Sequence, residues 1–238
     1  MPSNFSSALP SRGIDELVER QVKRWMLDQE SRRAQPRVVA EPARPVITIS
    51  REEGSNGTAL GHLVADKLGF QLWDQELIRG VARHSGASEA LLALVDERAR
   101  GAIEELLAGV LMGDAGTEGG YLESLLSVIH AVASRGAAVV VGRGAQFVLA
   151  PGAALRVRVV GPIEARAHEL AVAGNLSERE ARGAVERIDR ERLGFIRHHF
   201  HCNGADPSAY DLVVNAVSIP PAYAVDIVVA AYHAKFPC

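Results

Sequence analysis

The residues of this chain that are best suited to chemistry form one glycine-rich segment, which reads Arg-Glu-Glu-Gly-Ser-Asn-Gly-Thr at positions 51–58. It follows an apolar strand-like stretch at 46–50 and precedes a helical pattern at 59–68. A turn between a strand and a helix presents free backbone N–H groups and the positive end of a helix dipole, and both favour a phosphate. The candidate phosphate-binding residues in this turn are Arg51, Gly54, Ser55, Asn56, Gly57 and Thr58.

This segment lacks the residues that a Walker A loop uses for phosphoryl transfer. A Walker A loop reads GxxxxGK[ST], in which the lysine reaches the terminal phosphates and the hydroxyl holds magnesium. The string does not occur in this chain. The segment therefore favours phosphate binding more strongly than phosphoryl transfer.

A second chemically suited group lies on a predicted helix that runs from Ser177 to about residue 199. At about 100 degrees per residue, Arg187, Arg190 and Arg197 fall within about 80 degrees of one another, and Arg192 points away from that trio. Guanidinium groups grip phosphate through paired hydrogen bonds, so the trio could close over bound phosphates. The alternative is a solvated helix face on which these arginines pair with neighbouring glutamates.

Two further candidates stand at predicted strand ends. Arg143 follows the apolar strand 137–141 and could hold an acceptor phosphate, although a local pairing would also explain it. Asp74 ends the short strand 71–74, at the carboxyl edge where open parallel sheets bind ligands. It is a candidate for contact with the acceptor or with magnesium.

Other clusters of titratable residues have simpler explanations. The histidine-rich run at 197–202 does not favour zinc, because adjacent His198 and His199 point in different directions on a helix and lack spaced partners. The acidic pairs at 96–97 and 104–105 have the character of helix surface.

These groups must be positioned by a mainly parallel sheet. Nearly continuous apolar strands are expected at 46–50, 71–74, 137–141, 155–160 and 212–216, with helical segments between them, a glycine-rich break near 113–120 and a closing helix at 220–236. The pattern predicts an α/β fold with helices on both faces of the sheet. A helical stripe at 14–33 and a proline-punctuated link form an N-terminal arm that could make a homodimer contact.

Composition limits the partners. A net charge of -3 and a pI near 6.3 give no electrostatic reason to expect nucleic acid or an anionic membrane. Two cysteines without a CxxC spacing, the absence of a signal peptide and the absence of a long apolar run predict a cytoplasmic protein.

Three blocks in order carry a resemblance to a known family: ITISREEGSNGTALGHLVADKLGF at 47–70, VVVGRGAQFVLAPGAALRVRVVGPIEAR at 139–166, and RIDRERLGFIRHHF with DPSAYDLVVNA up to 216. Together they resemble the cytidylate kinase-like family. The resemblance implies a P-loop NTPase-type three-layer fold with a helical lid at about 175–207, in a domain at 46–238 that follows an arm at 1–45. It also implies transfer of the ATP γ-phosphate, with Mg2+, to CMP or a related nucleotide.

The resemblance places individual residues as well. It puts residues 54–58 in the phosphate loop, Arg143 at the arginine of the GRD motif, and Arg187, Asp189 and Arg190 in the lid. The chain departs from the family pattern at the loop lysine, which is Gly57, and at the Ser/Thr position, which is Ala59. The two acids that flank the GRD arginine are replaced by Val141 and Gly144.

Three functions stay open from the sequence. The first is a nucleoside monophosphate kinase, which the retained arginines favour. The second is a nucleotide-binding sensor or interaction protein that has lost phosphoryl transfer, which the missing lysine and acids favour. The third is a kinase for another small phosphorylated or hydroxylated substrate.

Overall fold

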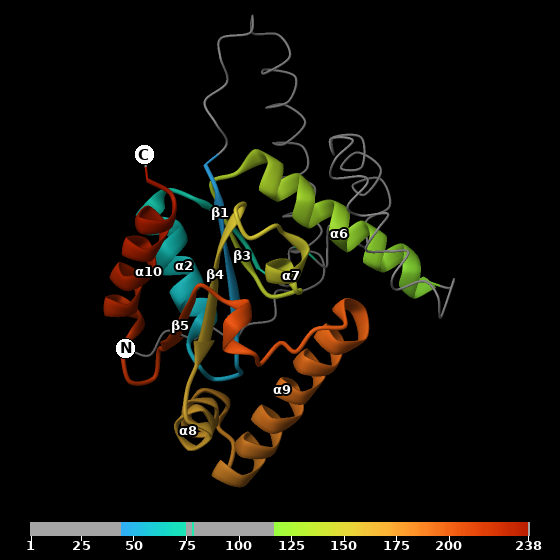
Figure 1. The fold of residues 1–238 in the computed structure, drawn as a ribbon. Coiled ribbons are helices and arrows are strands. Elements are labelled where there is room, and N and C mark those ends of the chain that lie inside the picture. Colours follow the sequence, from blue (N-terminus) through green and yellow to red (C-terminus); the bar gives the residue numbers. More distant parts are fainter. Residues whose placement is uncertain (1–43, 75–77, 79–116, 238) are drawn as a thin grey trace, which may run out of the picture. The chain divides into compact units, whose positions relative to one another are not determined.

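The computed structural model describes residues 44–74, 78 and 117–237, which belong to two compact units (Figure 1). The described part of one unit comprises residues 45–74 and 137–237. The described part of the other consists mainly of α6 (Thr117–Arg135). The predicted arm, the acidic pairs near residue 100 and the first half of the predicted glycine-rich break lie outside the described residues.

The first unit is built on a five-stranded parallel sheet in the order β2-β3-β1-β4-β5. Its strands are β1 (Val46–Arg51), β2 (Gln71–Trp73), β3 (Ala138–Val141), β4 (Ala154–Val160) and β5 (Leu212–Asn215). The central strand β1 pairs Ile49 with Val141 of β3 and Arg51 with Val159 of β4. The predicted parallel sheet is confirmed, and β1 runs one residue beyond its predicted end, to Arg51.

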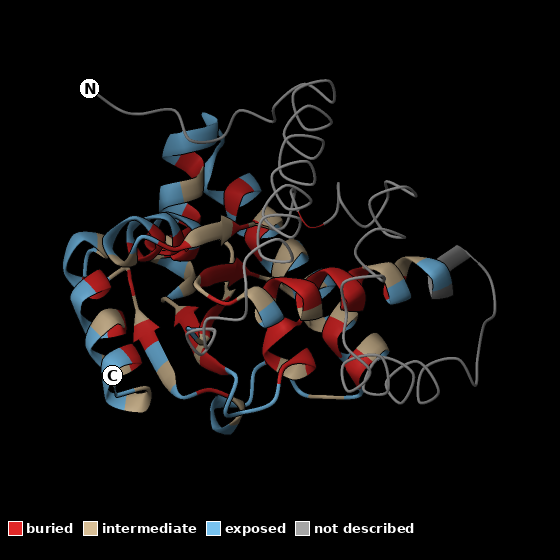
Figure 2. Ribbon diagram, turned by 90° about the horizontal axis from the view of Figure 1, so that it is seen from above, coloured by how far each residue is buried: buried red, intermediate tan, exposed pale blue. Residues whose placement is uncertain are grey.

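Helices cover both faces of this sheet, as predicted. The helices α2 (Gly57–Leu68) and α10 (Pro221–Lys235) pack on one face and on each other. On that side the strands and helices share one apolar core, which includes Ile47, Leu60 and Val228. On the other face, α7 (Ala145–Val148) contacts β1. Figure 2 shows the buried positions along the strands and on the sheet-facing sides of the helices.

A helical hairpin extends from the carboxyl end of β4 (Figure 1). It consists of α8 (Ile163–Gly174) and α9 (Glu178–Phe200), which pack against each other. The predicted capping box is present: the Ser177 hydroxyl accepts a hydrogen bond from the Glu180 amide, and the Glu180 carboxylate accepts one from the Ser177 amide. This box fixes the start of α9. A short 3-10 turn, η1 (Pro207–Ala209), then precedes β5.

The second unit is represented by α6, whose fully or almost fully buried apolar side chains include Leu122, Leu125, Leu126, Val128, Ile129 and Val132. The predicted break at 113–120 is wrong in its second half, because α6 begins at Thr117 and contains Gly119 and Gly120. Glycine costs a helix only about 1 kcal/mol relative to alanine, which packing of an apolar helix face offsets. No helix among the described residues is long and apolar enough to cross a membrane.

Candidate functional site

The loop after β1 has the geometry expected of a phosphate-binding turn. It passes through Gly54, with φ of 72°, and Asn56, with φ of 62°, and then enters α2. Asn56 makes no side-chain cap, so the first N–H groups of α2 remain available to a ligand at the positive end of the helix dipole. The predicted residues Gly54, Asn56, Gly57 and Thr58 are therefore brought together in one turn at the N-terminus of α2.

Ser55 has a different part in this turn. Its side chain is buried, and its hydroxyl lies 2.8 Å from the Glu52 carbonyl oxygen and 3.3 Å from the Val159 carbonyl oxygen. Its hydroxyl therefore ties the loop to itself and to β4. Any contact of Ser55 with phosphate would involve the backbone.

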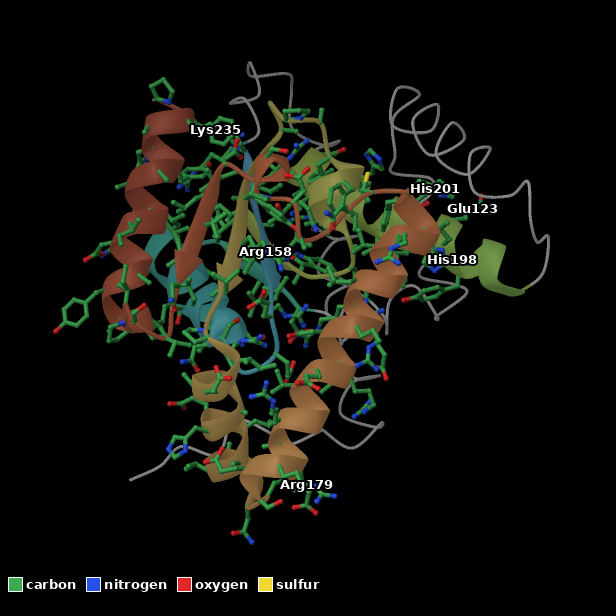
Figure 3. The ribbon with its side chains drawn as sticks, turned by 60° about the horizontal axis from the view of Figure 1, so that its bottom comes forward. Glu123, Arg158, Arg179, His198, His201 and Lys235 are labelled. Atoms are coloured by element: carbon green, nitrogen blue, oxygen red, sulfur yellow. The ribbon has the colours of Figure 1, made fainter. Side chains whose placement is uncertain are left out.

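Ion pairs between Glu52 and two buried arginines, Arg158 and Arg166, support the loop. The Glu52 carboxylate is 3.1 Å from Arg158 Nη2 and 3.4 Å from Arg166 Nε, and it accepts a hydrogen bond from the Gly161 amide at 3.2 Å. Arg158 is 8% exposed and Arg166 is 6% exposed. Figure 3 shows Arg158 in the interior, whereas Arg179 and His198 lie on the surface of α9. Sequence reasoning missed this network, although a charged residue within the apolar strand β4 was a visible signal.

The helix α9 is fastened to the loop through Asp189. The Asp189 Oδ1 atom accepts a hydrogen bond of 2.8 Å from the Glu53 amide, and its Oδ2 atom lies 2.6 Å from Arg166 Nη1. Arg166 also donates to the Glu53 carbonyl oxygen at 2.9 Å. Asp189 was predicted to bind nucleotide, and in the structure its carboxylate connects α9 to the backbone of the loop after β1 and to Arg166.

The arginine of α9 that reaches the loop is Arg192. It donates to the Arg51 carbonyl oxygen at 3.3 Å and pairs with the Glu53 carboxylate. Sequence reasoning separated Arg192 from the arginine trio correctly but did not choose it as a site residue. The helical angles alone fix which residues share a face, and they do not fix which face is turned toward the loop.

The predicted trio lies on another face of α9. Arg187, Arg190 and Arg197 are exposed, and Arg187 pairs with Glu191 at 2.9 Å. At about 100 degrees per residue, all three point more than about 100 degrees away from the bisector of Asp189 and Arg192. The structure therefore does not bring the trio to the loop.

Three other predicted residues come together where β1, β2 and β3 end. Arg143 has φ of 56°, and its guanidinium carbon lies 5.7 Å from the centre of the Phe195 ring of α9. The pKa of Arg51 is lowered to about 10, mainly by burial and then by the positive charges of Arg192 and Arg143, while the negative charges of Glu53 and Asp74 act in the opposite direction. Arg51, Arg143 and Asp74 are thus near enough to interact electrostatically.

The lost acid of the GRD pattern has a steric explanation in this structure. A Cβ atom at Gly144 would lie 2.2 Å from the ring of Phe200, at the end of α9. Phe200 also stacks with Phe147 of α7, with ring centres 6.2 Å apart. An aromatic side chain therefore occupies the space that a side chain at position 144 would require.

The described residues contain no group of three or more His, Cys, Asp or Glu side chains that could hold a metal ion. Mg2+ binds through one or two carboxylates together with waters and substrate phosphates, so a single carboxylate beside the loop would be enough to hold it. Asp74, which directly follows β2 and acts electrostatically on Arg51, is the carboxylate that the sequence analysis named for such a contact.

Comparison with known proteins matches residues 46–218 to the model of the cytidylate kinase-like family. A solved structure of an uncharacterized protein from Eubacterium ventriosum ATCC 27560 has 18% identity and a TM-score of 0.65, and the alignment covers 80% of this chain and 99% of that chain. A gluconokinase from Sinorhizobium meliloti 1021 has 18% identity and a TM-score of 0.45 over 81% of this chain and 93% of its own. A shikimate kinase from Bacteroides thetaiotaomicron has 16% identity and a TM-score of 0.45 over 82% and 99%. No curated protein matches this chain.

Proposed function

Because this chain belongs to the cytidylate kinase-like family, we propose that it is a kinase that transfers the γ-phosphate of ATP to a nucleoside monophosphate, CMP or a related nucleotide. One observation carries this proposal. Guanidinium groups from three separate segments, Arg51 of β1, Arg143 after β3 and Arg192 of α9, gather beside the loop that opens α2. Phosphoryl transfer needs positioning and positive charge more than covalent chemistry from the protein, and this arrangement offers both.

The residues divide into a donor side and an acceptor side. The turn at residues 54–58 and the N-terminus of α2 would bind the donor phosphates through backbone N–H groups. Arg192 of α9 would bind the transferred phosphate after the ion pair between Arg192 and Glu53 has opened. Arg143 would hold the acceptor phosphate. Asp74 would be the carboxylate that holds Mg2+, and the charge of Mg2+ would help to neutralise the charge of the ATP phosphates.

A second candidate function is a nucleotide-binding sensor without phosphoryl transfer. It is favoured by the protein carboxylates at the loop: Asp189 accepts from the Glu53 amide, and Glu53 pairs with Arg192. A third, a kinase for another small substrate, is favoured by Phe200, which fills the space next to Gly144 on the acceptor side.

The test is a coupled assay of ADP release by the full chain with ATP and Mg2+. The acceptor panel should contain the nucleoside monophosphates and small hydroxylated acids, with thermal-shift titrations of the same ligands in parallel. Turnover with a nucleotide acceptor that falls in Arg192→Ala and survives in Arg182→Ala supports the proposal. Arg182 is the matched control because it lies on the same helix and pairs with Glu164 and Glu186 at the surface.

The other outcomes discriminate between the alternatives. Stabilisation by nucleotide without turnover would favour the sensor. Turnover with a small acid alone would favour the third function.

A further inference from the structure

We propose that Arg51 supplies the cation that this phosphate loop lacks at the lysine position, and that position 57 is glycine because Arg51 needs the space. The inference rests on the proposed function, since it assigns a role in binding the donor phosphates. In this interpretation the loop has not lost its positive charge. The charge comes from Arg51 at the end of the strand, instead of from a lysine at the start of the helix.

The first observation is a steric conflict between the two positions. A Cβ atom built on Gly57 would lie 2.4 Å from the Cβ atom of Arg51 and 3.2 Å from the Cβ atom of Val159. The Arg51 Cβ is fixed by a backbone that pairs with Val159 in the sheet, so it cannot move aside as the end of a flexible side chain could. With Arg51 in this position, any side chain at residue 57, lysine included, is excluded.

The second observation is the direction of the Arg51 side chain. Its Nη1 atom lies 2.4 Å from the position that a Cβ on Gly142 would take. Gly142 directly follows β3, and its amide donates to the Ile49 carbonyl oxygen of β1 at 2.9 Å. The guanidinium therefore extends along the carboxyl edge of the sheet, from the phosphate loop to the strand end that carries Arg143. A cation at this place lies between the donor loop and the proposed acceptor arginine.

The third observation is the balance of charge around this guanidinium. Arg192 and Arg143 repel it, and Glu53 and Asp74 attract it, so that three cationic groups face two carboxylates. Burial is the largest cause of the lowered pKa of Arg51, and the value of about 10 still leaves Arg51 protonated at neutral pH. A phosphate at this site would relieve the repulsion among the arginines. The planar fork of an arginine also presents two parallel N–H donors to two phosphate oxygens, in a fixed geometry that the ammonium group of a lysine does not have.

The role in binding is tested with pyrophosphate, which presents linked phosphates without a base or an acceptor. Calorimetry on the full chain should show binding by the wild type, a loss of about tenfold or more in Arg51→Ala, and a smaller loss in Arg51→Lys. Arg182→Ala should stay within about twofold of the wild type, since Arg182 lies at the surface. Circular dichroism of each variant checks folding, and the charge-retaining Arg51→Lys keeps the test informative if Arg51→Ala does not fold.

The proposed steric conflict between Arg51 and a side chain at position 57 is tested by a double-mutant cycle. The cycle measures thermal stability and needs no ligand. Gly57→Ala should lower the melting temperature of the wild type, against the usual gain from alanine in a helix. In an Arg51→Gly background the same substitution should be neutral or stabilising. An equal loss in both backgrounds would overturn the steric link.

The outcomes separate this inference from the proposed function. If the wild type does not bind pyrophosphate, or if Arg51→Ala binds it equally well, the inference is wrong. Nucleotide kinase activity that persists in Arg51→Ala would leave the proposed function standing and remove the inference. Pyrophosphate binding that depends on Arg51, in a protein that phosphorylates no nucleotide, would do the reverse.

Discussion

Two faces of α9 both carry arginine and acidic side chains, but the two faces differ in what these side chains contact and in how far they are exposed to water. On one face Asp189 and Arg192 reach the phosphate loop, where they are hydrogen bonded to its backbone and lie partly shielded from water. On the other face Arg187 pairs with Glu191 one helical turn away, and both side chains are about 60% exposed. Water screens the charge at the loop less than it screens the charge at the surface. Position on the helix, and not residue type, therefore decides which arginine reaches the loop.

The difference between the two faces is tested most directly by removing one arginine from each face. We expect Arg192→Ala to lower kcat/KM for the nucleotide acceptor by about 100-fold or more, because a positioned guanidinium in phosphoryl transfer contributes on that scale. Arg190→Ala removes a member of the predicted trio, and its loss in kcat/KM should be at least tenfold smaller. The measurement is steady-state kinetics of both variants. A larger loss in Arg190→Ala would mean that the trio is the functional face after all.

The supporting network allows a second test, which concerns stability. Arg166→Ala should lower the free energy of unfolding by about 3 kcal/mol, because it leaves Glu52 and Asp189 with fewer partners in a partly buried place. Chemical denaturation measures this value. Arg182→Ala, which breaks only exposed pairs, is the control. A similar small effect in both variants would show that the network does not stabilise the loop.

The exposed face should respond much less. Arg187→Ala should change the free energy of unfolding by less than about 0.5 kcal/mol, because an exposed i,i+4 pair is weak. Denaturation at low and at high salt measures both this effect and its screening. A loss above about 1 kcal/mol would indicate that Arg187 has a partner beyond Glu191.

The smallest expected effect is a change with pH at the tip of the hairpin. The hydrogen bond from His168 to the Glu178 carboxylate, at 2.7 Å, raises the pKa of His168 above its ordinary value, mainly through that bond and then through the charge of Glu178. A raised pKa in the folded state means that this pair stabilises the fold at low pH and that its contribution is lost as the pH rises through the folded-state value. An NMR titration should show the raised pKa and its return toward normal in Glu178→Gln. Equal pKa values of His168 in the wild type and in Glu178→Gln would show that the pair between His168 and Glu178 does not form.

Much of the fold was predictable because its signals are local. The apolar strands, the capping box at Ser177 and the glycine-rich turn after β1 were read from residue types and spacing, and the structure contains each of them. The break predicted near residue 120 failed where it could be examined, because glycine is a weak signal in a helix that buries an apolar side. The predicted arm and its homodimer contact stay predictions.

The site was predictable at strand ends and unpredictable where its residues contact partners that are distant in the chain. Arg51, Arg143 and Asp74 lie at or just after the ends of strands whose parallel order brings their carboxyl ends to one edge, so their proximity follows from the strand pattern. Arg158, Arg166 and Arg192 were missed because their partners are distant in the chain. The Glu52 contacts of Arg158 and Arg166 span 106 and 114 positions, and such distances carry no periodic signal.

Residue types and their spacing were enough to predict the order of strands and helices, the place of the phosphate loop and the relative angles of the arginines on α9. These depend on backbone propensity, hydrophobic period and helical geometry, all of which act over a few residues. Tertiary packing turns Arg192 toward the loop, places Phe200 in the space beside Gly144 and brings Arg51 so close to Gly57 that a side chain there is excluded. Each of these depends on how separate elements pack, and packing is a property of the whole core and not of any one segment.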